Sequence, residues 1–368
     1  MPTWPGPSGI QSLTDVAVTE DDRPRLTVDL AALARNLRAL RSRRPTARAM
    51  PVIKANAYGL GAVPVAKALA GAGAAGFFVA YPQEAEELRD AGIDRVIYCL
   101  NARGGSGTYT DLVRPVLSTR PELDRWRGGP CAVQVEIGMN RLGIRPDELD
   151  LIPVRRDVTL VIAHMSDAGE PASPRNDQQR KRFAGLARRL TGMFPDAALS
   201  LSATGGLMLD GQVAETVIRP GIGLFGGRAG VPPALEAVAR LDARVLSVHD
   251  VPAGDHVGYD GRWTAARPSR LATLAIGYAD GVPRSLGNRG SVSLGGACAP
   301  IVGAVSMDLL TVDVTGLPPV EPGDRAEIFG PHLPLDEVAA TSGTIGYELL
   351  TRVGARVVRV YRDASSVR

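Results

Sequence analysis

Apolar and polar positions alternate in two ways along the first two thirds of the chain. Short apolar runs of strand length are separated by stretches with helical spacing, as in 31–40, where Leu33, Leu37 and Leu40 share one face. Counting from residue 50, eight runs read as strands: 50–53, 77–80, 95–100, 114–118, 131–137, 159–164, 198–202 and 216–219. This count and alternation predict an α/β fold, and favour a (β/α)8 TIM barrel over a doubly wound sheet.

The pattern changes beyond about residue 241. Helical periodicity gives way to short alternating runs separated by glycine, and only 335–340 and 345–353 read as helical. We therefore expect a flexible tail at 1–23, a barrel at 24–242 and a mostly β C-terminal domain at 243–368. The tail carries prolines, glycines and an acidic run but no apolar core, which argues against a signal peptide.

Composition and charge exclude several classes of protein. Hydrophobic residues make up 45% and charged residues 22% of the chain, as is ordinary for a globular protein. The net charge of +3 is small for 368 residues, so neither nucleic acid nor a membrane is an expected partner. The three cysteines, Cys99, Cys131 and Cys298, are widely spaced, which argues against disulfides or a zinc site. We expect a cytoplasmic protein without a metal.

Polar residues end many of the predicted barrel strands. They are Lys54, Asn101, Ser118, Glu136, His164, Thr204 and Arg219. In a barrel these ends converge on one mouth, where the chemistry of this fold is placed. Lys54 stands out because only two other lysines occur, Lys67 and Lys181. A lysine amine can form an imine, whereas a guanidinium stays protonated and cannot.

Several collinear segments carry a resemblance to a known family. They are KANAYG at 54–59, GMNRLG at 138–143, RPGI at 219–222, GDHVGY at 254–259, IGYADG at 276–281, VSMD at 305–308 and TIGYE at 344–348. In order and spacing they resemble the alanine racemase family, whose members use pyridoxal 5'-phosphate (PLP), over about residues 24–362. The resemblance implies an isomerase with a barrel and a β domain, which racemises a small amino acid, L-alanine to D-alanine.

The resemblance also implies two catalytic bases on opposite faces of the substrate. Lys54 would hold PLP covalently and act on one face, and Tyr278 would act on the other, linked through His164 to Arg219. Free lysine and tyrosine have pKa values of about 10.4 and 10, so each must be lowered by about 3 units to act near pH 7. Desolvation and cationic neighbours can do this for the lysine, whereas the tyrosine requires a positive partner.

The remaining site residues follow from the same resemblance. Arg219 would donate to the pyridine nitrogen and keep it unprotonated, which favours racemisation over transamination. Phosphate would be bound by Tyr58, Thr204, Gly221, Ile222 and Tyr347. Arg141 would contact the cofactor and the substrate carboxylate, and Met307 and Asp308 would line the substrate side. Because Tyr278, Met307 and Asp308 would reach the neighbouring subunit, the resemblance implies a homodimer with shared active sites.

Four positions depart from the family pattern. Leu60 replaces a usual histidine, Ala203 replaces an asparagine before Thr204, and Gly346 replaces an asparagine before Tyr347. Gln134 stands where many members carry a carbamylated lysine, an anion that positions the arginine. A glutamine there could still accept a hydrogen bond from Arg141. These departures keep a racemase of serine or another small amino acid, in specialised metabolism or resistance, as an alternative.

Three other readings make different demands on the sequence. A PLP decarboxylase of similar architecture would carry a glutamate at the pyridine nitrogen, where this chain has Arg219. A metal-dependent barrel aldolase or epimerase would need clustered ligands, yet His164 is the only histidine in the barrel segment. A non-catalytic PLP carrier would lack the β domain that holds Tyr278.

Overall fold

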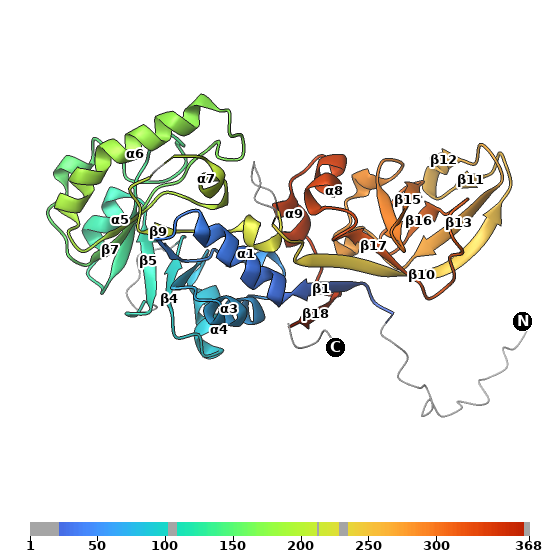
Figure 1. Ribbon diagram of the computed structural model, residues 1–368, viewed down its shortest axis with the longest axis horizontal. Helices are drawn as coiled ribbons and strands as arrows, with labels where there is room; N and C mark the ends of the chain where they lie inside the picture. Colours follow the sequence, from blue (N-terminus) through green and yellow to red (C-terminus); the bar gives the residue numbers. More distant parts are fainter. Residues whose placement is uncertain (1–21, 102–108, 212, 228–234, 364–368) are drawn as a thin grey trace, which may run out of the picture.

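Eight parallel strands close into a barrel in the first part of the chain (Figure 1). The computed structural model describes residues 22–101, 109–211, 213–227 and 235–363, so the expected tail lies almost wholly outside the described residues. Strands β3 to β8 pair in sequence order, and β2 pairs with β9. The bridges Val52–Phe78 and Ala203–Arg219 then join β2 to β3 and β8 to β9. The expected (β/α)8 barrel is confirmed.

The barrel strands are short and follow the predicted runs closely. They are β2 (Arg48–Ala49), β3 (Gly76–Val79), β4 (Val96–Cys99), β5 (Val113–Leu117), β6 (Cys131–Gln134), β7 (Val158–Ile162), β8 (Ala198–Ser200) and β9 (Val217–Ile218). Neighbouring positions on a strand face opposite sides of the sheet. On β3, Phe78 joins the cluster that also holds Tyr98 and Leu160, whereas Phe77 and Val79 pack in a different one. The barrel interior is therefore a packed core.

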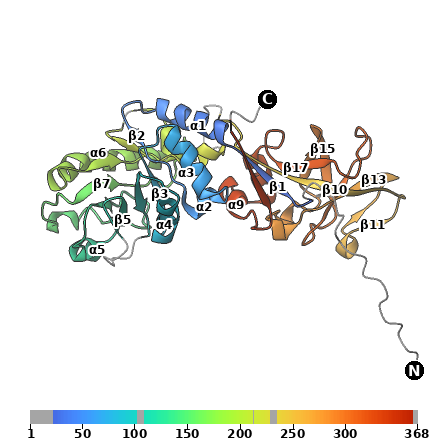
Figure 2. The same ribbon diagram turned by 90° about the horizontal axis from the view of Figure 1, so that it is seen from below.

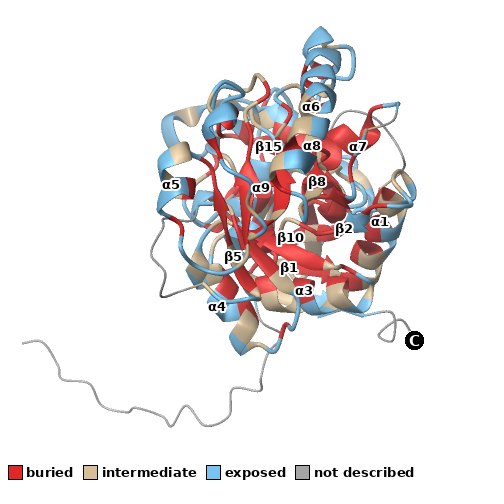
Figure 3. Cartoon of the chain, turned by 90° about the vertical axis from the view of Figure 1, so that its left-hand side faces the viewer, coloured by how far each residue is buried: buried red, intermediate tan, exposed pale blue. Residues whose placement is uncertain are grey.

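Helices cover the outside of the barrel, apart from two short ones that border its mouth. They are α1 (Leu30–Ser42), α2 (Lys54–Tyr58), α3 (Ala62–Gly71), α4 (Pro82–Asp90), α5 (Arg120–Arg125), α6 (Pro174–Met193) and α7 (Thr204–Met208). Asp29 caps α1 by accepting a hydrogen bond from the amide of Ala32, at 2.7 Å. The buried face of α1 carries Leu33 and Leu37, as its spacing predicts. Seen from the barrel end, buried strands are surrounded by helices with exposed outer faces (Figure 3).

The C-terminal part is built on a sheet of eight strands in the order β13-β16-β15-β14-β17-β10-β1-β18. These strands are β1 (Arg25–Asp29), β10 (Ala239–Val251), β13 (Ser269–Leu274), β14 (Ser291–Leu294), β15 (Ala297–Val302), β16 (Leu310–Asp313), β17 (Arg325–Phe329) and β18 (Val358–Arg362). A small pair, β11 (His256–Val257) and β12 (Trp263–Thr264), lies beside it. The helices of this part are α8 (Leu335–Ser342) and α9 (Gly346–Thr351). The expected mostly β domain is confirmed.

The two parts are joined through the first strand and the longest one. β1 precedes the barrel in sequence, yet it lies between β10 and β18 in the C-terminal sheet. β10 spans the junction expected near residue 243. Helix α9 meets the loop after α2 at this junction (Figure 2), where a Cβ on Gly59 would lie 2.6 Å from the carbonyl oxygen of Leu350. The C-terminal part therefore contacts the segment that carries Lys54.

None of the helices within the described ranges is long and apolar enough to cross a membrane.

Candidate active site

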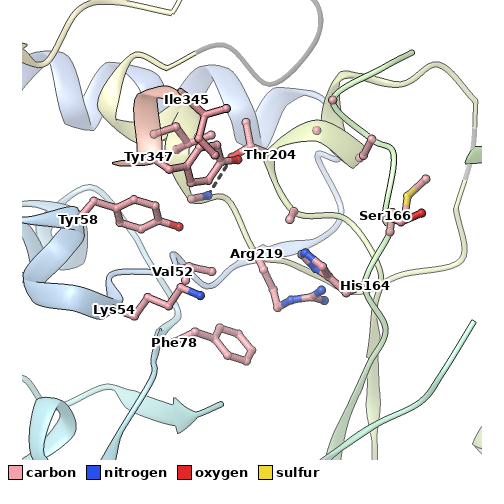
Figure 4. Close-up of a pocket in the computed structure, with 18 of the residues that line it drawn as sticks. Val52, Lys54, Tyr58, Phe78, His164, Ser166, Thr204, Arg219, Ile345 and Tyr347 are labelled. Atoms are coloured by element: carbon pink, nitrogen blue, oxygen red, sulfur yellow. Dashed lines mark hydrogen bonds between the residues drawn. The ribbon is translucent and has the colours of Figure 1, made fainter. Parts of the chain in front are cut away.

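A cavity of about 590 Å³ opens at the carboxyl ends of the barrel strands, beneath α8 and α9. Its volume falls within the range of about 300–1,000 Å³ typical of small-molecule sites. Nine residues singled out from the sequence line it: Lys54, Tyr58, Arg141, His164, Thr204, Arg219, Gly221, Ile222 and Tyr347. Figure 4 shows Lys54, His164 and Arg219 around the same space, with Tyr58, Thr204 and Tyr347 on one side of it. The predicted site residues that belong to the barrel, together with Tyr347, therefore lie around one cavity.

Lys54 begins an unusual left-handed turn. The four residues that follow it, 55–58, have φ values of 53°, 54°, 52° and 56°. A left-handed conformation costs roughly 1–2 kcal/mol for each such non-glycine residue, so neighbouring groups must hold the turn. A Glu84 carboxylate oxygen accepts from the amide of Ala55 at 2.5 Å, and the side-chain oxygen of Asn56 accepts from Ala62 at 2.7 Å. The backbone at Lys54 is therefore fixed from α4 and α3.

The amine of Lys54 is tuned toward its basic form. Lys54 is an exposed residue at the open mouth, but partial desolvation of its amine lowers its pKa, and repulsion from Arg141 lowers it further. Glu84 acts in the opposite direction, because an anion stabilises the ammonium. The net lowering suits an amine that must lose its proton to bind a carbonyl carbon or to act as a base.

Arg219 and His164 form the floor of the cavity. The Arg219 guanidinium is buried and donates to the Ser200 hydroxyl at 2.5 Å and to the Ala163 carbonyl oxygen at 2.6 Å. These bonds use Nη1 and Nη2, and within the described residues no partner is assigned to Nε. Burial lowers the pKa of Arg219 to about 10, so it remains a cation at neutral pH. Burial and then Arg219 lower the pKa of His164 to about 3, so the imidazole is neutral there.

A group of hydrogen-bond donors, here called the donor cup, lies across the cavity from Arg219 and His164. The Thr204 hydroxyl oxygen accepts from the amides of Gly221 at 2.9 Å and Gly223 at 3.2 Å. A Cβ on Gly221 would lie 2.6 Å from the Tyr58 hydroxyl, so only glycine allows this approach. Burial raises the pKa of Tyr347 to about 12 and that of Tyr58 as well, which keeps both phenols protonated donors. This set of hydroxyls and backbone amides fits a phosphate group.

Three predicted residues lie elsewhere. Tyr278, Met307 and Asp308 belong to the C-terminal part, and none of them lines the cavity of the same chain. Tyr278 is 41% and Met307 52% exposed, so both side chains are accessible from solvent. The structure therefore does not bring the two expected bases, Lys54 and Tyr278, to one cavity within a single chain.

The strand-end residues divide between two hollows. Lys54, His164, Thr204 and Arg219 line the main cavity. Ser118 and Glu136 line a second hollow of about 650 Å³, and Arg141 borders both. Asn101 is exposed and lines neither. Four of the seven strand-end residues thus line the main cavity, and Ser118, Glu136 and Asn101 do not.

Some residues of the site were not anticipated from the sequence. Phe78 lies beneath Lys54 in Figure 4, and Ile345 lies beside Tyr347. The inward alternation of β3 could have indicated Phe78, whereas Ile345 lies just before the helix that carries Tyr347. Glu84 and Ser200, which hold Lys54 and Arg219, gave no signal because their role depends on distant partners.

Comparison with known proteins agrees with this geometry. Residues 28–229 match the family described as "Alanine racemase, N-terminal domain", and 238–361 match "Alanine racemase, C-terminal domain". An alanine racemase of Methylobacterium sp. (strain 4-46) is 41% identical over 95% of this chain and 100% of that protein. The chain belongs to the alanine racemase family. Its resemblance to this family, expected from the motifs, is confirmed.

Solved members of the alanine racemase family share the whole architecture. The enzyme of Bartonella henselae, solved with covalently bound pyridoxal phosphate, superposes with a TM-score of 0.85 at 33% identity, covering 92% of this chain and 99% of that one. The biosynthetic alanine racemase of Pseudomonas aeruginosa gives a TM-score of 0.84 at 34% identity, with the same coverage. The amine, the cationic floor and the donor cup described above therefore occur in a fold that binds this cofactor in a relative.

The structure shows the surroundings of three departures from the family pattern. A Cβ on Gly346 would lie 2.7 Å from a carboxylate oxygen of Asp336, so a larger residue would require the Asp336 side chain to move. The Gln134 amide donates to the Leu142 carbonyl oxygen at 2.8 Å. The expected hydrogen bond from Arg141 to Gln134 does not occur among the described residues; Gln134 instead holds the backbone beside Arg141. Leu60 is fully buried, where a histidine would need a polar partner.

Proposed function

We propose that this protein is a PLP-dependent racemase that interconverts L-alanine and D-alanine, with Lys54 and Tyr278 as its two bases. The observation that supports this most is the placement of Lys54, whose pKa is lowered, in a cavity with a cationic floor and a phosphate-sized cup. Membership of the alanine racemase family and a PLP-bound relative support the same conclusion.

Each group of the cavity has a part in this function. When bound, PLP supplies the electron sink that makes the α-proton of the amino acid acidic. Lys54 would hold its aldehyde carbon and, once released, take or return a proton on one face. Thr204, Tyr58 and Tyr347 would hold the phosphate, and the free Nε–H of Arg219 would donate to the ring nitrogen. The residues that carry these donors all line the cavity, which supports these roles.

The second base would come from another copy of the chain. Tyr278 is exposed and outside the cavity, so a homodimer with shared active sites would bring it to Lys54 of the partner. Arg141 and Arg219 put two guanidinium groups around the cavity, and a phenol entering it near them would have its pKa lowered. We further propose that the protein acts in the cytoplasm, as its unpaired cysteines indicate.

The decisive experiment is a product analysis in deuterium oxide. Purified protein loaded with PLP is incubated separately with L-alanine, D-alanine and L-serine, and both the enantiomer ratio and the α-deuterium content are followed. We expect racemisation with α-deuterium in both alanine enantiomers. Faster turnover of L-serine would reassign the substrate, and α-deuterium without inversion would contradict a racemase.

A further inference from the structure

Arg356 binds two carboxylates in the C-terminal part. Its Nε and Nη2 atoms donate to the two carboxylate oxygens of Asp280, at 2.6 and 3.0 Å. Nη2 also lies 2.6 Å from a carboxylate oxygen of Asp308. Asp280 is only 1% exposed, whereas the Arg356 side chain is 47% exposed, so the guanidinium fork pairs with a buried carboxylate from the solvent side. One side chain thus connects residues 28 positions apart in sequence.

Both carboxylates belong to segments that the proposed function uses. Asp280 ends the turn that carries Tyr278, and its carboxylate accepts from the amide of Gly277 at 2.9 Å. Asp308 follows Met307 on the substrate side. The two segments also touch through their backbones, since the amides of Tyr278 and Ala279 donate at 3.0 Å each to the carbonyl oxygens of residues 306 and 307.

The same C-terminal segment also contacts the Lys54 turn. Arg359 donates to the carbonyl oxygen of Gly59 at 2.8 Å, and the Tyr361 hydroxyl donates to that of Leu60 at 2.9 Å. Residues 356–361 therefore contact the Tyr278 turn at one end and the backbone after Lys54 at the other. Of these contacts, only Arg356 joins the Tyr278 turn to Asp308 through side chains.

We propose that Arg356 is a positioning residue that holds Tyr278 and Asp308 in one fixed arrangement, so that proton transfer on the Tyr278 face depends on it. This inference rests on the proposed function. The backbone hydrogen bonds hold the two segments together but leave the carboxylates of Asp280 and Asp308, which share Arg356, to repel each other if the guanidinium is removed. The guanidinium offsets this repulsion by pairing with both oxygens of Asp280 and with one oxygen of Asp308.

The test separates the two faces of the substrate. Arg356→Lys and Arg356→Gln are loaded with PLP, and α-proton exchange in deuterium oxide is measured at initial rate from each alanine enantiomer. The enantiomer whose exchange Tyr278→Phe abolishes defines the Tyr278 face. On that face we expect a loss of about 10-fold for Arg356→Lys and about 100-fold for Arg356→Gln, the size of effect that a misplacement of about 1 Å has. The other face should stay within about 2-fold.

Arg352 provides a matched control in the same segment. It pairs with Glu348 at 3.0 Å, and its side chain is as open to solvent as that of Arg356, at 55% against 47%. Arg352→Lys and Arg352→Gln should leave exchange on both faces unchanged. The thermal midpoint and the visible absorbance of bound PLP are measured for every variant. If Arg356→Gln does not fold, Arg356→Lys decides.

The outcomes separate this inference from the proposed function. If the wild-type protein racemises alanine but Arg356→Lys exchanges both enantiomers as Arg352→Lys does, the positioning role is wrong and the function stands. An equal loss on both faces also overturns it, since that result indicates a general structural effect. If the wild-type protein does not racemise alanine, the proposed function fails first.

Discussion

The barrel cavity and the Tyr278 surface differ in how completely one chain builds them. In the cavity, Arg219 and Thr204 are buried and hydrogen-bonded within the chain, and Lys54 sits on a turn braced by Glu84. On the C-terminal part, the Tyr278 backbone is equally well held, but its side chain extends into solvent. In both regions the backbone is therefore fixed by hydrogen bonds of the same chain. Only in the cavity does the same chain also supply the charged and buried surroundings of the side chains.

Burial and nearby charges decide whether each tyrosine acts as a hydrogen-bond donor or as a base. Burial raises the pKa values of Tyr58 and Tyr347, so these phenols stay protonated and serve as donors. Tyr278 has to lose its proton to act as a base, which needs cations close by. The cavity contains two guanidinium groups, those of Arg141 and Arg219. Under the proposed function, the Tyr278 phenol of another copy of the chain would have to lie close to them to act as a base.

The largest predicted effect tests whether the two regions meet between chains. Lys54→Ala and Tyr278→Phe should each lower racemisation by about 10³-fold, because each removes a base. When the two variants are unfolded and refolded together in equal amounts, half of the dimers are mixed and each mixed dimer has one intact site. About a quarter of wild-type activity should therefore return. No recovery would show that the site lies within one chain.

A second test of the difference between Lys54 and Tyr278 is α-proton exchange, measured separately from each alanine enantiomer. Tyr278→Phe should keep α-proton exchange from one alanine enantiomer and lose it from the other by about 10²-fold or more, since Lys54 still serves its own face. The readout is α-deuterium content at initial rate, with wild-type protein as reference. Equal losses for both enantiomers would point to a single base.

A smaller effect is expected in the donor cup. Thr204→Val keeps the shape but leaves the buried amides of Gly221 and Gly223 without an acceptor, which costs roughly 1–3 kcal/mol for each. The thermal midpoint should fall and the PLP concentration needed for half-saturation should rise. Thr204→Ser retains the hydroxyl and is the control. Equal PLP binding by both variants would remove Thr204 from the cup.

The smallest effect concerns stability against acid. The pKa of His164 is about 3 in the folded chain and about 6.5 when unfolded, so below pH 6.5 the unfolded state binds a proton that the folded state does not. Stability should fall as pH drops, by about 2 kcal/mol between pH 6.5 and 5. His164→Gln should flatten this part of the profile of the midpoint against pH. An unchanged slope would contradict a neutral, desolvated imidazole.

The fold followed from the sequence where apolar periodicity was strong. The barrel strands and the buried face of α1 matched the pattern, because each element buries one continuous apolar side. Helix α6 did not, since its buried positions include Asn176 and Gln179 and its outer face is long and charged. The pairing of β1 with β18 is equally invisible to local patterns, because the two strands lie at opposite ends of the sequence.

Site residues could be predicted from the sequence where they belong to a motif or end a predicted strand. Nine residues named from the sequence do line one cavity, among them Lys54 and Arg219. The left-handed turn after Lys54 was not foreseen, since alanine at residues 55 and 57 gives no sign of a positive φ. Nor was the support given by Glu84 and Arg356, which depends on hydrogen bonds to distant parts of the chain.

The position of β1 has a consequence for how the chain is made. Its two neighbours, β10 and β18, both follow the barrel in sequence. β1 therefore has both hydrogen-bonding edges unpaired while the whole barrel is translated. One edge can close when β10 emerges from the ribosome, and the other only when β18 does.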